Sequence, residues 1–204
     1  MDRGGLEMTL IKRSALASIL ISMGVAANLN MGNPLGPFLF AFGLLGVCGM
    51  NAYLYTGKVG LWYKDNKLST LKVLVFNLLF GYLCGAAIGT LDFQIAELAM
   101  TKIVTWNFTP EFLIEAIFCG AIMYIAVFIY QICDSPLGIL LGVPVFIFCG
   151  FQHSIANAIV LGVAYQIVPI GIEEVGLIAF AALGNAIGAI LINELILVKD
   201  KYKY

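Results

Sequence analysis

The sequence is poor in charge and almost without histidine. Only 11% of its 204 residues are charged and one is histidine, whereas 61% are hydrophobic and the mean hydropathy is +0.98. Soluble globular domains carry roughly a quarter of their residues as charged side chains. The scarcity of charge therefore excludes a soluble domain and predicts a chain whose solvent is the lipid bilayer.

Several chemical signatures are also missing. The formal net charge is −1, which gives no basic excess for nucleic acid. The five cysteines lie in apolar stretches without CxxC or Cys/His spacing, so they read as packing thiols and not as disulfides or metal ligands. With no Gly-rich phosphate loop, no second histidine and no Ser/His/Asp motif, the sequence favours a protein that is not an enzyme and needs no cofactor.

Long apolar runs dominate what is present. Each is close to the ~20 residues with which a helix crosses ~30 Å of hydrocarbon, and none alternates as barrel strands do. No small-residue cleavage site and soluble domain follow the first run, so we expect it to be retained. We predict one all-α membrane domain over residues 1–204, with six transmembrane helices at residues 10–28, 37–55, 69–90, 112–131, 136–163 and 171–198.

Positive charge is distributed unevenly about these six segments. If all six span, one face collects ten of the eleven basic residues, and the other face has Lys102 alone. The positive-inside rule then puts both termini in the cytoplasm. We expect the membrane to be the plasma (cytoplasmic, or cell inner) membrane. The ten residues are Arg3, Lys12, Arg13, Lys58, Lys64, Lys67, Lys72, Lys199, Lys201 and Lys203.

The second and fifth segments are interrupted at corresponding places. Each passes from an aromatic stretch through a Cys-Gly pair, at residues 48–49 and 149–150, into polar residues. Irregular backbone at membrane depth is tolerated where it lines a cavity. Broken helices in matching positions of two halves indicate an inverted repeat with a path between them, here about residues 8–100 and 110–200.

The single histidine, His153, lies just after the second interruption. An ionisable side chain at membrane depth is costly to bury and indicates function more often than structure. With an ordinary pKa of about 6.5, imidazole is the side chain best suited to carry a proton near neutral pH. His153 therefore points to a channel or transporter, with attraction of an anion and proton donation to it both open.

The residues around both interruptions resemble motifs of the formate/nitrite transporter family. The stretch Gly150-Phe-Gln-His-Ser-Ile-Ala-Asn157 is similar to the signature Gly-Phe-Glu-His-Ser-x-Ala-Asn, and Ala52-Tyr-Leu-Tyr-Thr-Gly57 is similar to Ala-Glu/Asp-Leu-Phe-Thr-Gly/Ser. Residues 76–86, 115–120 and 183–188 agree with the third, fourth and sixth helices. The resemblance implies an aquaporin-like fold with three plus three helices, usually a homopentamer with one pore per subunit. It also implies transport of small monovalent anions such as formate, nitrite, lactate or hydrosulfide.

The resemblance also implies roles for individual residues. His153 matches the central pore histidine, and Thr56 the threonine of the loop that interrupts the second helix. Phe40 and Leu44 match one hydrophobic constriction and Phe146 the other. Asn185 matches an asparagine near the pore. Local chemistry leaves alternatives open, since Thr56 also suits a broken helix end, Asn185 suits a contact between helices, and the apolar three suit ordinary packing.

Four positions depart from the family pattern. Gln152 replaces a glutamate, Tyr53 replaces an acid, and Tyr124 stands where the fourth helix offers an asparagine towards the pore. The vestibule lysine is missing near Phe108, and Lys102 is the one residue able to substitute. These departures bear on the transported solute more than on the fold.

The sequence thus predicts a channel or transporter for small weak-acid anions, with protons as co-substrate through His153. A bare anion pays many kcal/mol to leave water, so apolar constrictions block it unless it takes up a proton. The alternatives are an aquaporin-like channel for neutral solutes, indifferent to pH, and a non-conducting membrane scaffold or sensor.

Overall fold

The computed structural model describes residues 3–62, 67–167, 169 and 171–199. Over these residues it contains helices and no strand, which confirms the predicted all-α class. The helices are α1 (Arg3–Met31), α2 (Leu35–Gly49), α3 (Tyr55–Lys58), the 3₁₀ helix η1 (Val59–Leu61), α4 (Lys67–Leu91), α5 (Phe93–Ile103), α6 (Pro110–Cys133), α7 (Leu137–Phe148), α8 (Ser154–Val163) and α9 (Ile172–Lys199).

Four helices are long and apolar enough to cross a membrane. They include residues Gly4–Met31, Lys67–Leu91, Pro110–Cys133 and Ile172–Ile196, and thus correspond to the first, third, fourth and sixth predicted segments. The second segment divides into α2 and α3, and the fifth into α7 and α8. None of these four pieces has the length of a membrane span.

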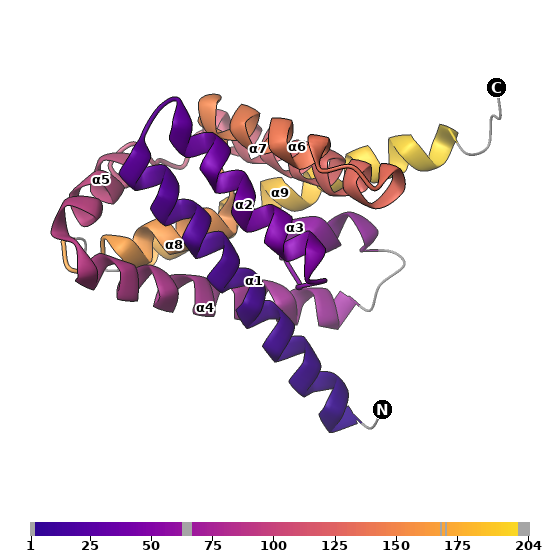
Figure 1. The fold of residues 1–204 in the computed structure, drawn as a ribbon, viewed down its shortest axis with the longest axis horizontal. Coiled ribbons are helices and arrows are strands. Elements are labelled where there is room, and N and C mark those ends of the chain that lie inside the picture. Colours follow the sequence, from indigo (N-terminus) through magenta and orange to yellow (C-terminus); the bar gives the residue numbers. More distant parts are fainter. Residues whose placement is uncertain (1–2, 63–66, 168, 170, 200–204) are drawn as a thin grey trace.

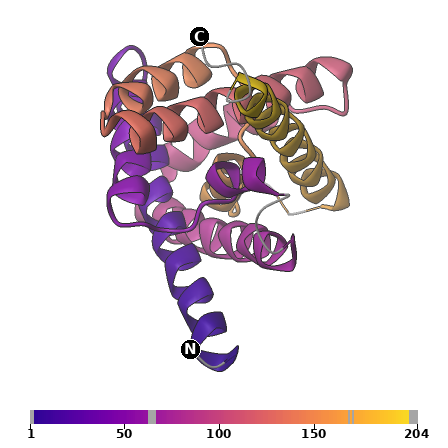
Figure 2. The ribbon, with the colours of Figure 1, turned by 90° about the vertical axis from the view of Figure 1, so that its right-hand side faces the viewer.

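The long helices enclose two of the short ones, α3 and α8. In Figure 1, α1 lies beside α2 and crosses α4, while α6 lies beside α7. The strongest packing is between α6 and α9 and between α4 and α8. Every residue of α8 is buried, and the end view in Figure 2 shows it in the interior with α3. Helices α3 and α8 therefore lie at the centre of the bundle, where polar backbone is shielded from lipid.

Helix α5 lies between the third and fourth apolar runs, where the sequence predicts no span. Asp92 caps its N-terminus by accepting a hydrogen bond from the Gln94 N–H at 2.8 Å. Its buried residues recur on one face, and this face packs on α8 and α1. The cap and the periodicity are both legible in the sequence, so α5 could have been predicted.

Glycines allow close contact between packed helices. A Cβ atom on Gly188 of α9 would overlap the carbonyl oxygen of Ile117 in α6, and one on Gly85 of α4 would overlap that of Ile159 in α8. Small residues let helix backbones approach in lipid, where van der Waals packing replaces hydrophobic association. These contacts set the distances between helices around the interior.

Gly188→Ala should therefore lower stability, because the backbone of α6 cannot yield as a flexible side chain can. We expect a loss of about 1–3 kcal/mol, typical of overpacking. Thermal unfolding in detergent, followed by helical circular dichroism, measures it. Gly49→Ala is the matched control, since its Cβ would meet nothing closer than the Tyr130 hydroxyl at 3.8 Å. Equal Tm values for the two variants would refute the contact.

Candidate functional site

The two interruptions of the bundle have the same length and the same turn. Helices α2 and α7 each end before a five-residue non-helical stretch, residues 50–54 and 149–153, which leads into α3 and α8. Each stretch has one left-handed residue, Asn51 at φ 52° and Gly150 at φ 72°. Gly and Asn are the residues that adopt this conformation at least cost. Asn51 and Gly150 therefore mark the turns that lead into α3 and α8.

Asn185 of α9 fastens the second stretch. Its Oδ1 accepts from the Ser154 N–H at 2.9 Å, and its Nδ2 donates to the carbonyls of Gln152 and Ala116, both at 2.8 Å. The side chain is fully buried. Asn185 thus binds backbone on three sides and holds the loop next to the histidine, which is the structural alternative left open by the sequence.

Asn77 of α4 fastens the first stretch in the same way. Its Oδ1 accepts from the Tyr55 N–H at 2.9 Å, and its Nδ2 donates to the carbonyls of Tyr53 and Ser14, both at 3.0 Å. It too is fully buried. The sequence analysis did not single out Asn77, although an asparagine in an apolar span is a signal for a hydrogen-bonded role.

His153 and Thr56 come together where the two stretches meet. The Thr56 Oγ1 lies 3.1 Å from His153 Nε2, and the exposed fractions of the two residues are 0% and 3%. His153 caps α8, because its Nδ1 accepts from the Ala156 N–H at 3.2 Å. A backbone N–H only donates, so the neutral ring carries its proton on Nε2 and donates it to the Thr56 hydroxyl.

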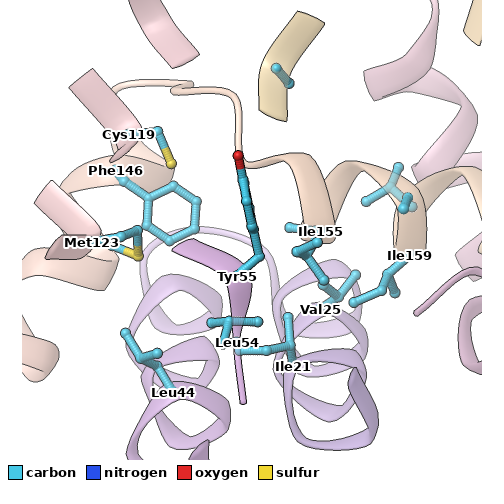
Figure 3. Packing of buried hydrophobic residues seen from close by; sticks show 14 of the residues in the cluster. Ile21, Val25, Leu44, Leu54, Tyr55, Cys119, Met123, Phe146, Ile155 and Ile159 are labelled. Carbon is cyan, nitrogen blue, oxygen red and sulfur yellow. The ribbon is translucent and has the colours of Figure 1, made fainter. Parts of the chain in front are cut away.

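Apolar side chains surround this pair. The Phe40 and Phe146 rings meet edge to face with centroids 5.6 Å apart, and the Phe146 centroid lies 5.9 Å from that of His153. Leu44 is 1% exposed. Figure 3 shows Phe146 and Leu44 in the buried hydrophobic cluster, which also contains Tyr55. The His153 ring therefore lies near Phe146, which in turn packs on Phe40, and Leu44 belongs to the same buried cluster.

A cavity of about 270 Å³ lies beside His153. Phe40, Phe146 and His153 form its inner end, and Lys102 of α5 and Asn28 of α1 line it further out. Lys102 is the residue that could substitute for the vestibule lysine. Its position at this cavity depends on α5, which was not predicted from the sequence. The cavity thus connects the histidine with a cation.

A second cavity, of about 190 Å³, opens towards the other end of α1. Its lining includes Leu44 and Leu54 on the inner side, and Arg13, Tyr53 and Lys58 further out. Arg13 and Asn28 are separated by four turns of α1, so the cavities face opposite ends of the bundle. His153 lines the first cavity, and Leu54 and Gly57, close to Thr56 in the chain, line the second.

Gln152 takes part in a polar chain beside the histidine. Its Nε2 donates to Glu115 Oε2 at 3.0 Å, and its Oε1 accepts from Asn157 Nδ2 at 2.9 Å. The Glu115 carboxylate is therefore tied to the stretch that contains the histidine. Tyr124 lies apart from this group: its hydroxyl donates to Asn193 Oδ1 at 2.7 Å, and its ring covers Gly60.

Comparison with known proteins gives a consistent family. The model of the formate/nitrite transporter family matches residues 6–198. A solved structure described as an FNT family ion channel superposes with a TM-score of 0.76 at 16% identity, covering 97% of this chain and 92% of its own. A pentameric formate channel with formate bound gives 0.70 at 18% identity, covering 96% and 97%. Comparison with curated protein sequences gives no match. Since the family model spans nearly the whole chain, the protein belongs to the formate/nitrite transporter family.

Proposed function

We propose that this protein is a transmembrane channel or carrier for small monovalent weak-acid anions of the formate, nitrite, lactate or hydrosulfide type, linked to protons through His153. The observation that carries the proposal is the buried Thr56–His153 pair, with one cavity lined by His153 and a second, towards the other end of the bundle, lined by Leu54 and Gly57. Membership of the family and the formate bound in the similar channel favour this class of cargo. The apolar helices and the membership of a transporter family both indicate an integral membrane protein.

Six crossings arise if α2 with α3, and α7 with α8, each count as one interrupted span. The halves about 8–100 and 110–200 would then form the inverted repeat. Two equivalent turn bonds support this: the Ala52 N–H donates to the Val47 carbonyl at 2.9 Å, and the Phe151 N–H to the Phe146 carbonyl at 3.0 Å. The equivalent three-bond roles of the asparagines in α4 and α9 support it independently.

We further propose that both termini lie in the cytoplasm, at a plasma membrane. An ion pair of Lys72 with Glu7 joins the start of α4 to the start of α1, on the end where Arg13 and Lys58 line a cavity. Lys102 belongs to the other end. This sorting agrees with the positive-inside rule. Lys64, Lys201 and Lys203 lie outside the described residues, as do the side chains of Arg3 and Lys199.

The constriction selects against charge. Phe40, Phe146 and Leu44 offer an anion no hydrogen bond, so a bare anion loses its hydration there without compensation. The Thr56 oxygen accepts from His153, which leaves the hydroxyl hydrogen free to donate to a carboxylate or nitrite oxygen. Such an anion is held without a fixed charge that would trap it.

Proton transfer at His153 involves the cap of α8. The ring becomes imidazolium only when Nδ1 takes up a proton. This requires the hydrogen bond from the Ala156 N–H to Nδ1 to break first. The imidazolium then gives a proton to the anion, which crosses as the neutral acid, and the ring returns to its neutral form. Anion and proton gradients set the direction.

Lys102 should concentrate anions in its cavity. Charges that line a cleft raise the local concentration of an oppositely charged solute. We expect Lys102→Met to raise the half-saturating formate concentration about three- to tenfold and to leave the maximal flux unchanged. Flux from the Lys102 side of proteoliposomes measures this. Lys67→Met, at the start of α4, is the matched control. If flux depends on formate concentration in the same way in both variants, Lys102 has no role in collecting the anion.

A homopentamer is the proposed assembly, by analogy with the similar pentameric channel. The apolar outer face of α4 supports this, since that helix is largely exposed in a single chain: Leu71, Val75 and Leu79 are each about half exposed. Native mass spectrometry of the purified protein should give five copies. A monomer would contradict this part of the proposal.

Flux measurements test the function itself. Purified protein in liposomes should carry one of formate, nitrite, lactate and hydrosulfide in a saturable, pH-dependent manner, and should carry little glycerol. Glycerol flux that ignores pH would favour the neutral-solute channel. No flux of any solute would favour a scaffold or sensor.

A further inference from the structure

We propose that the Asn157 side chain is a binding group for the solute in the cavity that His153 and Lys102 line. Asn157 lies one turn along α8 from the histidine, and its backbone N–H donates to the His153 carbonyl at 2.8 Å. The residue is 8% exposed and lines the same cavity of about 270 Å³. The inference rests on the proposed function and deepens it, because it adds a group that contacts the transported acid.

The Asn157 amide has hydrogen-bonding capacity to spare. A carboxamide offers two N–H hydrogens and one oxygen. The Asn157 Nδ2 uses one hydrogen to donate to Gln152 Oε1 at 2.9 Å. In the part of the chain that the structure describes, the second hydrogen and Oδ1 have no partner. A nearly buried polar group without a partner is costly, so a hydrogen-bonding solute in the cavity is favoured.

Gln152 fixes which atoms of Asn157 stay free. The Gln152 Nε2 donates to Glu115 Oε2 at 3.0 Å and to the Gly150 carbonyl at 3.1 Å. A carboxylate and a carbonyl both accept, so the Gln152 amide cannot be turned round, and its Oε1 must face Asn157. Asn157 therefore gives a hydrogen to Gln152 and keeps its own oxygen available.

Gln152 also separates a carboxylate from the cavity. Gln152 lines the cavity, whereas Glu115 is not one of its lining residues. Among the described lining residues Lys102 is a cation and none is acidic. A carboxylate on the wall would repel an anion. The glutamine that departs from the family signature thus gives a neutral wall, and Glu115 acts on the cavity through it.

The free atoms of Asn157 match both forms of a small weak acid. An oxygen of the anion, as in formate or nitrite, accepts a hydrogen bond from the amide N–H. The neutral acid carries an O–H, which donates to Oδ1. Because the amide is uncharged, it binds the solute both before and after the proton arrives. The cavity then has Lys102 to attract charge and Asn157 to hold the solute.

Formate is the probe for this binding group. Saturation-transfer NMR from the purified full chain to the formate proton measures binding without transport. Asn157→Leu, similar in size but without polar atoms, should weaken formate binding about tenfold. Asn30→Leu, at an exposed asparagine of α1 outside the cavity lining, is the matched control. No transfer in the wild type, or equal affinity in the wild type and Asn157→Leu, would overturn the proposal.

Glu115 variants test the positioning in a chain that keeps Asn157. Glu115→Leu removes one acceptor of Gln152 Nε2 and should weaken formate binding about threefold. Glu115→Gln retains an acceptor oxygen and should recover most of that loss. The double variant with Asn157→Leu should bind no worse than Asn157→Leu alone, because both act through one amide. Additive losses would refute the positioning role of Glu115.

Formate flux in proteoliposomes separates the binding group from the function. Asn157→Leu should raise the half-saturating concentration from the Lys102 side about tenfold and leave the maximal flux unchanged. Formate binding that depends on Asn157 in a protein without flux would uphold the binding group and contradict the proposed function. Flux with an unchanged half-saturating concentration in Asn157→Leu would uphold the function and refute the binding group.

Discussion

His153→Asn should abolish proton-linked anion flux, with a drop of about 100-fold or more, the usual scale for a proton-transfer group. Asparagine is a favourable N-cap and can accept from the Ala156 N–H in place of Nδ1, so α8 should keep its first turn. What the substitution removes is the group that gains and loses a proton near neutral pH. Initial rates of formate entry into proteoliposomes, between about pH 5 and pH 8, measure the effect.

The control for this variant is structural. The Tm and the oligomeric mass of His153→Asn should equal those of the wild type, so that lost flux reports on chemistry. Thr56→Ser, which retains a hydroxyl at the position bonded to Nε2, should keep most of the flux. Wild-type rates with wild-type pH dependence in His153→Asn would contradict the role given to the histidine.

Asn185→Ala should cause the largest loss of stability of any single substitution considered. It leaves the Ser154 N–H and the Gln152 carbonyl without their Asn185 partner, and it removes a second hydrogen bond from the Ala116 carbonyl, which also accepts within α6. An unsatisfied buried backbone group costs about 1–3 kcal/mol, so the total is roughly 2 kcal/mol or more. Chemical unfolding in mixed micelles gives this free energy.

Asn77→Ala should cost a similar amount, because its side chain serves the equivalent three backbone groups of the first stretch. Asn30→Ala is the matched control: that exposed asparagine of α1 bonds only the Ala26 carbonyl in its own helix. Similar losses in the two buried variants would support the inverted repeat. Losses of stability no greater than that of Asn30→Ala would show that the two non-helical stretches keep their conformation without Asn77 and Asn185.

The sequence was sufficient for the class of fold and for part of the site. Continuous apolar runs predict membrane helices, because lipid offers no hydrogen bonds and a helix satisfies its own backbone groups. The structure has four helices long and apolar enough to span a membrane. Polar residues in the second and fifth runs predict that these runs are interrupted. The contact of Thr56 with His153 follows once both interruptions face the same interior.

Other features depend on contacts that a sequence does not display. Tyr124 stands where the family offers an asparagine towards the pore, and its hydrogen bond to Asn193 joins two helices in a way that the sequence does not display. Arg13 of α1 and Lys58 of α3 both lie over the Tyr53 ring, and nothing in their spacing along the chain predicts that they share it. Asn77 was visible as a polar residue in a span, but its partners lie in three separate segments.

The central claim is that an anion crosses the constriction together with a proton, and one measurement tests it directly. Proteoliposomes with a pH-sensitive dye inside would receive an inward formate gradient, with protein-free and His153→Asn vesicles as controls. The account predicts that formate entry acidifies the lumen faster than in both controls and needs no ionophore to balance charge. Formate entry that leaves the internal pH unchanged and stops without an ionophore would contradict it, because the anion would then cross bare.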